Sequence, residues 1–138
     1  MIRNRKILSA VLAVVVAVIA FIYGTVDVAN KSLQFDLKKI GESIYEAHAK
    51  SGKWPMQIAD LEGTEYLNMP YRRGILENGS FVIVWQQDLD PNPDANSGRI
   101  LAYANSGLLS RLGKVWACRG DLRIVKIGNE EKQRLKAR

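Results

Sequence analysis

The sequence predicts an α+β protein in which a long N-terminal helix packs on a small antiparallel sheet of four to five strands. Three observations predict this fold. Residues 7–26 are uncharged and mostly apolar, residues 26–47 repeat apolar side chains at helical spacing, and the apolar residues alternate from about residue 80 onward. We expect three parts, namely a basic end with a transmembrane anchor at 1–26, an extracytoplasmic domain at 27–128 and a polar tail at 129–138.

The run from residue 7 to residue 26 is long enough to cross a membrane as a helix. A helix rises 1.5 Å per residue, so this run spans about 30 Å, the thickness of the hydrocarbon core. Three basic residues precede it: Arg3, Arg5 and Lys6. Positive charge stays on the cytoplasmic side, so we expect a single-pass protein of the cytoplasmic (inner) membrane with Asp27 onward outside.

A cleaved signal peptide is the alternative for this run. Its apolar region would be 7–15 residues long, and small residues would precede the cut. Val18-Ile19-Ala20 could be such a site, but the apolar run continues through Tyr23. This extra length favours a retained anchor, and either interpretation exports the domain.

Small residues recur along one face of the same run, at spacings of three and four. They are Ser9, Ala13, Ala17, Ala20 and Gly24. Such a face would let a second transmembrane helix approach closely. An alanine-rich anchor without a helix partner gives the same pattern and is the simpler interpretation, because alanine is common in this run.

The next segment carries the most regular pattern in the chain. Its apolar stripe has helical spacing and consists of Val26, Ala29, Leu33, Leu37, Ile40, Ile44 and Ala47. Gly52 and Pro55 supply a stop. We therefore predict one helix from Ile7 to about Ser51, with Gly24 as the place where it would bend and with its second half covering a sheet.

The remaining elements are short. A helix of one to two turns is expected around Ile58 and Leu61, followed by a hairpin at 75–77 and 80–87 that turns at Asn78-Gly79. A strand at 100–103, a loop bracketed by Gly107 and Gly113, and a second hairpin at 115–118 and 122–127 complete the sheet. Residues 129–138 are predicted to be a solvated tail. The three tryptophans, Trp54, Trp85 and Trp116, are expected in the core.

Part of this pattern resembles a known family. Asp36-Leu37-Lys38-Lys39-Ile40 to Tyr45, then Ser51-Gly52-Lys53-Trp54-Pro55 and Leu61, is similar to the stretch after the membrane helix of type IV pilins and type II secretion pseudopilins. The resemblance covers residues 7–65. It implies a pilin-like fold and a non-enzymatic structural or interaction role with secretion or envelope machinery.

The chain departs from that family at its start. Pilins carry a Gly-Phe cleavage site before the apolar run and a glutamate a few residues later, whereas Lys6 meets Ile7 directly here and the run contains no acidic residue. The resemblance therefore implies a pilin-like domain on a permanent anchor, and it puts filament assembly in doubt. The oligomeric state is left open.

A polar loop offers oxygen ligands at alternate positions. They are Asp88, Asp90, Asn92, Asp94 and Asn96. Calcium prefers several oxygen ligands from a flexible loop, and the resemblance adds that major pseudopilins bind calcium in a late loop. The EF-hand pattern fails, because Ala95 and Leu101 stand where glycine and glutamate are needed. A calcium- or ligand-binding domain is thus the alternative function, and a proline-stiffened loop without a cofactor is the simpler interpretation.

Other chemistry is sparse. His48 and Cys118 are the residues that would suit a nucleophile–base pair, but no third orienting group is indicated, so we predict no enzyme. Cys118 is the single cysteine, which excludes an intramolecular disulfide and favours a buried thiol. Outside the N-terminus, 17 basic residues are scattered among 14 acidic ones, so we expect no nucleic-acid partner.

Overall fold

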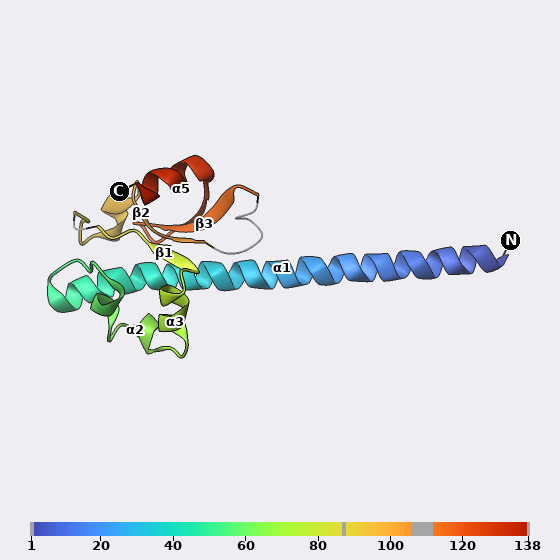
Figure 1. Cartoon of the computed structure of the whole chain (residues 1–138), viewed down its shortest axis with the longest axis horizontal. Helices are drawn as coiled ribbons and strands as arrows, with labels where there is room; N and C mark the ends of the chain where they lie inside the picture. The colour runs from blue at the N-terminus through green and yellow to red at the C-terminus, as the bar shows by residue number, and fades with distance from the viewer. Residues whose placement is uncertain (1, 87, 106–111, 138) are drawn as a thin grey trace. The chain divides into compact units, whose positions relative to one another are not determined.

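The computed structural model describes residues 2–86, 88–105 and 112–137, with side chains from Ile7 onward. The elements in chain order are helix α1 (Ile2–Ser51), the 3-10 turn η1 (Ile58–Leu61), helices α2 (Glu65–Asn68) and α3 (Arg72–Glu77), strand β1 (Phe81–Ile83), the 3-10 turn η2 (Pro93–Asn96), strands β2 (Ile100–Ala104), β3 (Lys114–Arg119) and β4 (Ile124–Gly128), and helix α5 (Asn129–Lys136). This is the predicted α+β fold, with the long N-terminal helix packed against a four-stranded antiparallel sheet (Figure 1).

The chain divides into two compact units, Met1–Ser32 and Leu33–Arg138. The first unit consists of the N-terminal part of α1. The second contains the rest of α1 and all the other elements. Each unit has its own pattern of burial.

The sheet of the second unit is a simple meander in the order β1-β2-β3-β4, with every neighbouring pair antiparallel. The register between β2 and β3 shifts between Ile100 and Ala102. This irregularity is a β-bulge, which places the neighbouring residues Leu101 and Ala102 in the same apolar cluster. The two faces of the sheet therefore carry two separate clusters.

The first cluster lies between α1 and the sheet and contains the predicted stripe. Leu37 and Ile40 are fully buried, and Ile44 and Ala47 are nearly so. They pack with Leu61, Tyr66, Leu76, Leu101, Ala102, Ala104 and Cys118. The three tryptophans are partly buried against this cluster, which is consistent with a core role. The prediction that the helical stripe covers the sheet is confirmed from Leu33 to Ala47, whereas the first two stripe residues lie outside this cluster, with Val26 partly buried and Ala29 exposed.

Gly41 lies where α1 packs closely against the sheet and the turn after β3. A Cβ atom added there would lie 2.6 Å from the Cys118 Sγ and 3.0 Å from a Leu122 methyl carbon. No side chain larger than hydrogen fits in this space, so glycine sets the distance between helix and sheet.

The second cluster lies on the opposite face of the sheet. Its buried members are Ile100, Tyr103, Val115, Ala117 and Ile127, and Leu135 of α5 packs against them. The prediction of a fraying tail is corrected, because residues 129–136 form a helix, although this segment is polar as predicted and none of its residues is buried. Glu130 and Glu131 in its first turn and Arg134 and Lys136 in its last turn complement the helix dipole.

The first strand of the predicted N-terminal hairpin is also wrong. Residues 75–77 belong to α3, in which Leu76 is buried. Gly79 does supply a positive φ, as expected, whereas Asn78 has φ −80°, and the two residues end a helix instead of turning a hairpin. Gly79 has φ +78° and Asn78 N–H donates to the Gly74 carbonyl. A helix C-cap and a tight hairpin turn make the same demand on glycine.

The strand predicted at 80–87 is shorter than expected, since β1 spans only Phe81–Ile83, and the other predicted elements are confirmed with small changes of boundary. The helix ends at Ser51, the short turn lies at Ile58–Leu61, and the strand at residue 100 and the second hairpin lie where expected. Gln87, the predicted end of the first long strand, and Gly107, one bracket of the following loop, lie outside the described residues.

Candidate functional site

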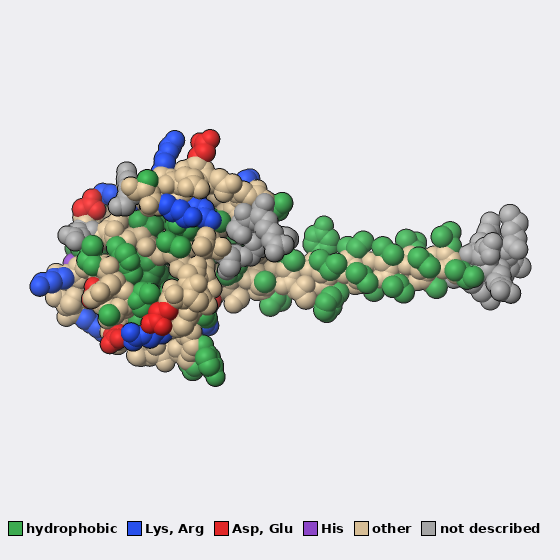
Figure 2. All heavy atoms as spheres, viewed as in Figure 1, with side chains coloured by type: hydrophobic (Ala, Val, Ile, Leu, Met, Phe, Trp, Pro, Cys, Tyr) green, Lys and Arg blue, Asp and Glu red, His purple; other side chains and the backbone are tan. Residues whose placement is uncertain are grey.

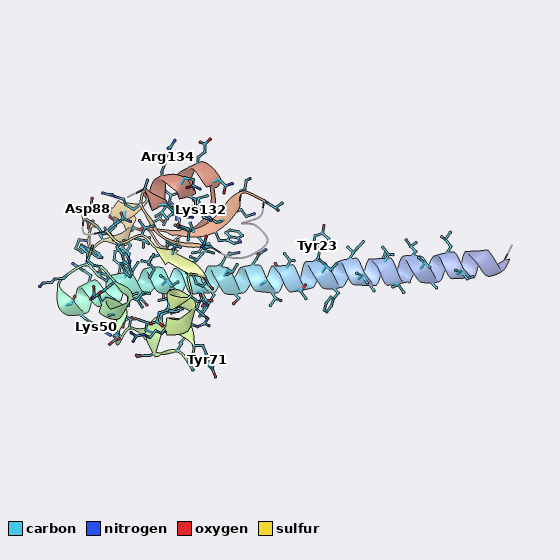
Figure 3. All side chains as sticks on the ribbon, viewed as in Figure 1. Tyr23, Lys50, Tyr71, Asp88, Lys132 and Arg134 are labelled. Atoms are coloured by element: carbon cyan, nitrogen blue, oxygen red, sulfur yellow. The ribbon has the colours of Figure 1, made fainter. Side chains whose placement is uncertain are left out.

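The apolar surface of α1 is the largest candidate site. Side chains from Ile7 to Tyr23 project from the helix on all sides (Figures 2 and 3). Leu8 and Phe21 are each 71% exposed, and even Val15 is 46% exposed. By length and composition, this is the one helix in the described part of the chain that could cross a membrane, and a signal sequence would pass the same test.

The predicted small-residue face belongs to this exposed stretch. Ser9, Ala13, Ala17, Ala20 and Gly24 are all exposed within the single chain. A Cβ atom added at Gly24 would have no neighbour within 4 Å, and α1 continues through this position. Helix–helix packing at this face stays a prediction.

The polar loop at 88–98 is organised around the buried polar side chain of Asn96, which is 5% exposed. Its Nδ2 donates to the Asp90 carbonyl and to the Tyr45 hydroxyl, each at 2.8 Å, and its Oδ1 accepts from Asp90 N–H at 3.0 Å. Tyr45 in turn donates to the Gly120 carbonyl at 2.7 Å. The Asn96 amide thus ties the loop to α1 and to the β3–β4 turn.

The side chains of the other four predicted calcium ligands lie at the surface, although the backbone of Asp90 takes part in the Asn96 network. Asp90 Oδ1 accepts from Asn92 N–H and Asn92 Oδ1 accepts from Asp94 N–H, which are local Asx turns. Asp88 pairs with Arg99. Among the described residues, no three His, Cys, Asp or Glu side chains converge as metal ligands. Calcium binding by this loop stays a prediction, and calorimetric titration with millimolar calcium tests it.

The turn after β3 fits closely against the same loop. Gly120 is buried, its N–H donates to the Arg99 carbonyl at 2.9 Å, and a Cβ atom added there would overlap the Asn96 backbone. Leu122 adopts φ +62° in this turn. The turn therefore has a structural role in closing the loop.

His48 and Cys118 have different neighbours. The His48 ring stacks on Trp54, with centroids 3.8 Å apart and planes 15° apart, and Tyr45 meets Trp54 edge-on at 5.5 Å. Cys118 is fully buried, and its Sγ donates weakly to the Arg119 carbonyl. Burial, with smaller effects of Asp121 and Glu42, raises the pKa of Cys118 to about 12. This cysteine is therefore a protonated thiol at neutral pH.

Sequence reasoning missed a buried ion pair beside α3. Arg72 Nη1 lies 2.8 Å from Asp36 Oδ1, and the guanidinium carbon lies 5.6 Å from the centroid of the Tyr66 ring. Desolvation raises the pKa of Asp36, and the charge of Arg72 opposes that shift. The only sequence signal was an acidic residue next to the apolar stripe.

Sequence reasoning also missed two grooves that adjoin strand β1. A groove of about 490 Å³ is lined by the Met56–Ala59 segment, Leu76 and β1. A larger groove of about 1210 Å³ lies along Val82, Val84 and Ile100 and reaches α5. The grooves share Met56, Val82, Ile83 and Trp85, so they meet along the same strand. Residues far apart in the chain form them, so no local pattern could have revealed them.

Comparison with known proteins gives no match to a family model, to a curated protein or to a solved structure.

Proposed function

We propose that the chain is a non-enzymatic, membrane-anchored interaction module of the cell envelope. Its N-terminal helix spans the cytoplasmic membrane, and its pilin-like domain lies on the outer face, where it contacts secretion or envelope proteins. One observation carries the proposal. The exposed apolar stretch of α1 is as long as a hydrocarbon core is thick, and none of it is buried within the chain.

The distribution of charge supports the orientation. The acidic residues all follow the apolar stretch, and Asp27 with its ion-pair partner Lys31 is the first charged position after it. Arg3, Arg5 and Lys6 precede the stretch. The excess of positive charge on the short N-terminal side favours its retention in the cytoplasm.

The interaction role rests on the resemblance to pilins and pseudopilins. The cleavage motif and the glutamate used in filaments are missing from the sequence. We therefore propose a permanently anchored subunit that contacts partner proteins at the membrane instead of polymerising through a processed N-terminus.

Localisation and processing together test this proposal. A C-terminal tag is added, cells are fractionated, and the mature chain is weighed by mass spectrometry. We expect the intact chain in the membrane fraction, with the tag digested by protease added outside the cytoplasmic membrane. A soluble fragment beginning near Phe21 would identify a signal peptide and overturn the anchor.

Replacement of the basic residues tests the orientation in the same cells. Exchange of Arg3, Arg5 and Lys6 for alanine should reduce the fraction of tags that external protease digests. Exchange of Lys132, Arg134 and Lys136 for alanine serves as a matched control, since it removes the same charge far from the apolar stretch. Equal effects of the two triple variants would contradict the proposed orientation.

A further inference from the structure

Strand β1 has a free backbone edge. It ends the sheet, and its inward hydrogen bonds are made by alternate residues: Val82 faces Tyr103, Val84 N–H donates to the Leu101 carbonyl, and the Ser80 carbonyl accepts from Asn105 N–H. The N–H and C=O of Ile83 lie between these positions, so they point away from β2. Within residues 2–86, 88–105 and 112–137, no hydrogen bond is made to these outward groups.

The two edges of the sheet differ in their protection. Strand β4 carries Lys126 in its centre and continues directly into α5. The β1 segment, by contrast, reads Phe81-Val82-Ile83-Val84-Trp85, without a charge, a proline or a glycine. An uncharged apolar edge is a site where another strand adds, and natural sheets block such edges when they are not used.

The grooves lie on both sides of this edge. Phe81, Ile83 and Trp85 pack against the first apolar cluster and form part of the smaller groove, which is otherwise lined mainly by apolar residues. Val82 and Val84 pack against the second cluster and face the larger groove. The two grooves overlap at the edge itself, since both are lined by Val82, Ile83 and Trp85. A strand that paired with β1 would place alternate side chains on the two faces of the sheet, toward the two apolar clusters, because side chains alternate across a sheet.

The larger groove has a mixed lining. Arg99 and Asp88 lie in it, together with Glu131 and Arg134 of α5; Figure 3 labels Asp88 and Arg134. Tyr103 also lines it and is 1% exposed, and its hydroxyl has no hydrogen-bond partner among the described residues. A guest side chain with a hydroxyl group suits this side, and an apolar side chain suits the other.

We propose that β1 accepts an extended segment of a partner protein as a fifth strand. An extended peptide can satisfy the outward groups of Ile83, whereas a helix uses its own backbone groups internally. The Met56–Ala59 segment and β1 both line the smaller groove, which has a volume of about 490 Å³, the scale of a few side chains of an extended peptide. This inference rests on the proposed function, for which it names the class of partner.

A seven-residue peptide of alternating valine and threonine is the probe. It is labelled with fluorescein, and its binding to the full chain in detergent micelles is followed by fluorescence anisotropy. We expect saturable binding, and slower hydrogen exchange of the Ile83 amide in the complex. The same peptide with methylated amides on alternate residues should bind at least tenfold more weakly. Absence of binding, or equal binding of the two peptides, would overturn the proposal.

Substitution of Ile83 separates the backbone from the side chain. Ile83→Pro removes the outward N–H at an edge position that bears no inward hydrogen bond, and Ile83→Ala loses a similar part of the side chain but keeps the N–H. We expect Ile83→Pro to bind the peptide about five- to tenfold more weakly than Ile83→Ala. Equal affinity of the two folded variants would overturn strand addition, and the methylated peptide remains decisive if Ile83→Pro does not fold.

Further outcomes of these experiments distinguish a second copy at the edge from a peptide, and failure of strand addition from failure of the membrane anchor. A dimer of the full chain that Ile83→Pro dissolves would show that the edge pairs with a second copy, contrary to the proposal. Failure of peptide binding by an intact, membrane-anchored chain removes strand addition alone. A processed, soluble chain that binds the peptide removes the anchor alone, so the two proposals fail separately.

Discussion

Both halves of helix α1 carry large apolar side chains, but these are exposed in the first half and mostly buried in the second. In the first half, Leu8 and Phe21 are each 71% exposed, and apolar side chains point in all directions. In the second half, Leu37 and Ile40 are fully buried against the sheet, and charged residues occupy the other faces. One continuous helix thus presents two different surfaces (Figure 2).

The difference shows that angular distribution, and not apolar content alone, determines what a helix packs against. An apolar stripe fits one protein surface, whereas an all-round apolar surface fits a solvent that is itself apolar. The two glycines illustrate the same contrast. A Cβ atom added at Gly24 would meet open space, whereas one added at Gly41 would lie too close to Cys118 and Leu122.

The largest expected difference between the two halves of α1 is in the free energy of unfolding when one large side chain in each half is truncated. Ile40→Ala should lower the free energy of unfolding of the domain by about 2–5 kcal/mol, because it leaves a cavity in a fully buried cluster. Val16→Ala, which truncates a 58% exposed side chain, should change it by less than about 0.5 kcal/mol. Urea unfolding of the detergent-solubilised chain, followed by tryptophan fluorescence, reports on the domain, since all three tryptophans lie there. Equal losses would contradict the distinction between the halves.

A charge in the middle of the first half tests its environment. Val15→Arg should cost about 2.5–3.5 kcal/mol of membrane insertion, as measured for arginine at the centre of a membrane helix. The chain should then appear partly in the soluble fraction after alkaline extraction of membranes. Val15→Leu keeps the apolar surface and is the control. If Val15→Arg and Val15→Leu partition equally, this half does not lie in lipid.

Replacing Gly41 and Gly24 with alanine should give smaller effects on stability, and the two effects should have opposite signs. Gly41→Ala should destabilise the domain by about 1–3 kcal/mol, because its Cβ would lie too close to the Cys118 sulfur. Gly24→Ala adds the same group where nothing lies within 4 Å, and it should stabilise the local helix by about 0.5–1 kcal/mol. Thermal unfolding by circular dichroism checks the first effect, and hydrogen exchange around residue 24 checks the second. A stable Gly41→Ala variant would show that helix and sheet separate easily.

Features that depend on local pattern could be predicted from the sequence. The stripe from Leu33 to Ala47, the end of α1 at Ser51 and the hairpin of β3 and β4 follow from periodicity and turn residues over a few positions. Val82 and Ile83 pack against different clusters, as the alternation of apolar residues from about residue 80 onward indicates.

Features that depend on contacts between residues far apart in the chain could not be predicted from the sequence. Residues 75–77 belong to a helix in which Arg72 pairs with Asp36, 36 positions earlier in the chain. Helix α5 packs against the second apolar cluster through Leu135. In the polar loop, the spacing of oxygens could not show that the Asn96 amide turns inward to Tyr45, 51 residues earlier. The two β1 grooves likewise combine segments from residue 56 to residue 136.

The smallest expected effect is electrostatic and belongs to the second half of α1. Glu46 Oε1 accepts from Lys50 Nζ at 2.6 Å, and Oε2 accepts from Glu65 N–H at 3.0 Å. The hydrogen bond from Lys50, followed by that from the Glu65 backbone, lowers the pKa of Glu46. Because this carboxylate is partly exposed, Glu46→Gln should cost only about 0.3–1 kcal/mol at neutral pH.

This small difference in stability should disappear as the pH falls. A carboxylate with a lowered folded pKa stabilises the folded state above its unfolded pKa, near 4.5, and the contribution is lost as pH falls through the folded value. The difference between the unmodified chain and Glu46→Gln in urea unfolding should therefore be constant from pH 7 to about pH 5 and should close at lower pH. Glu77→Gln, which removes an exposed partner of Arg73, should show little difference across the same range. A Glu46 difference that persists at the lowest pH would indicate lost packing instead of lost charge.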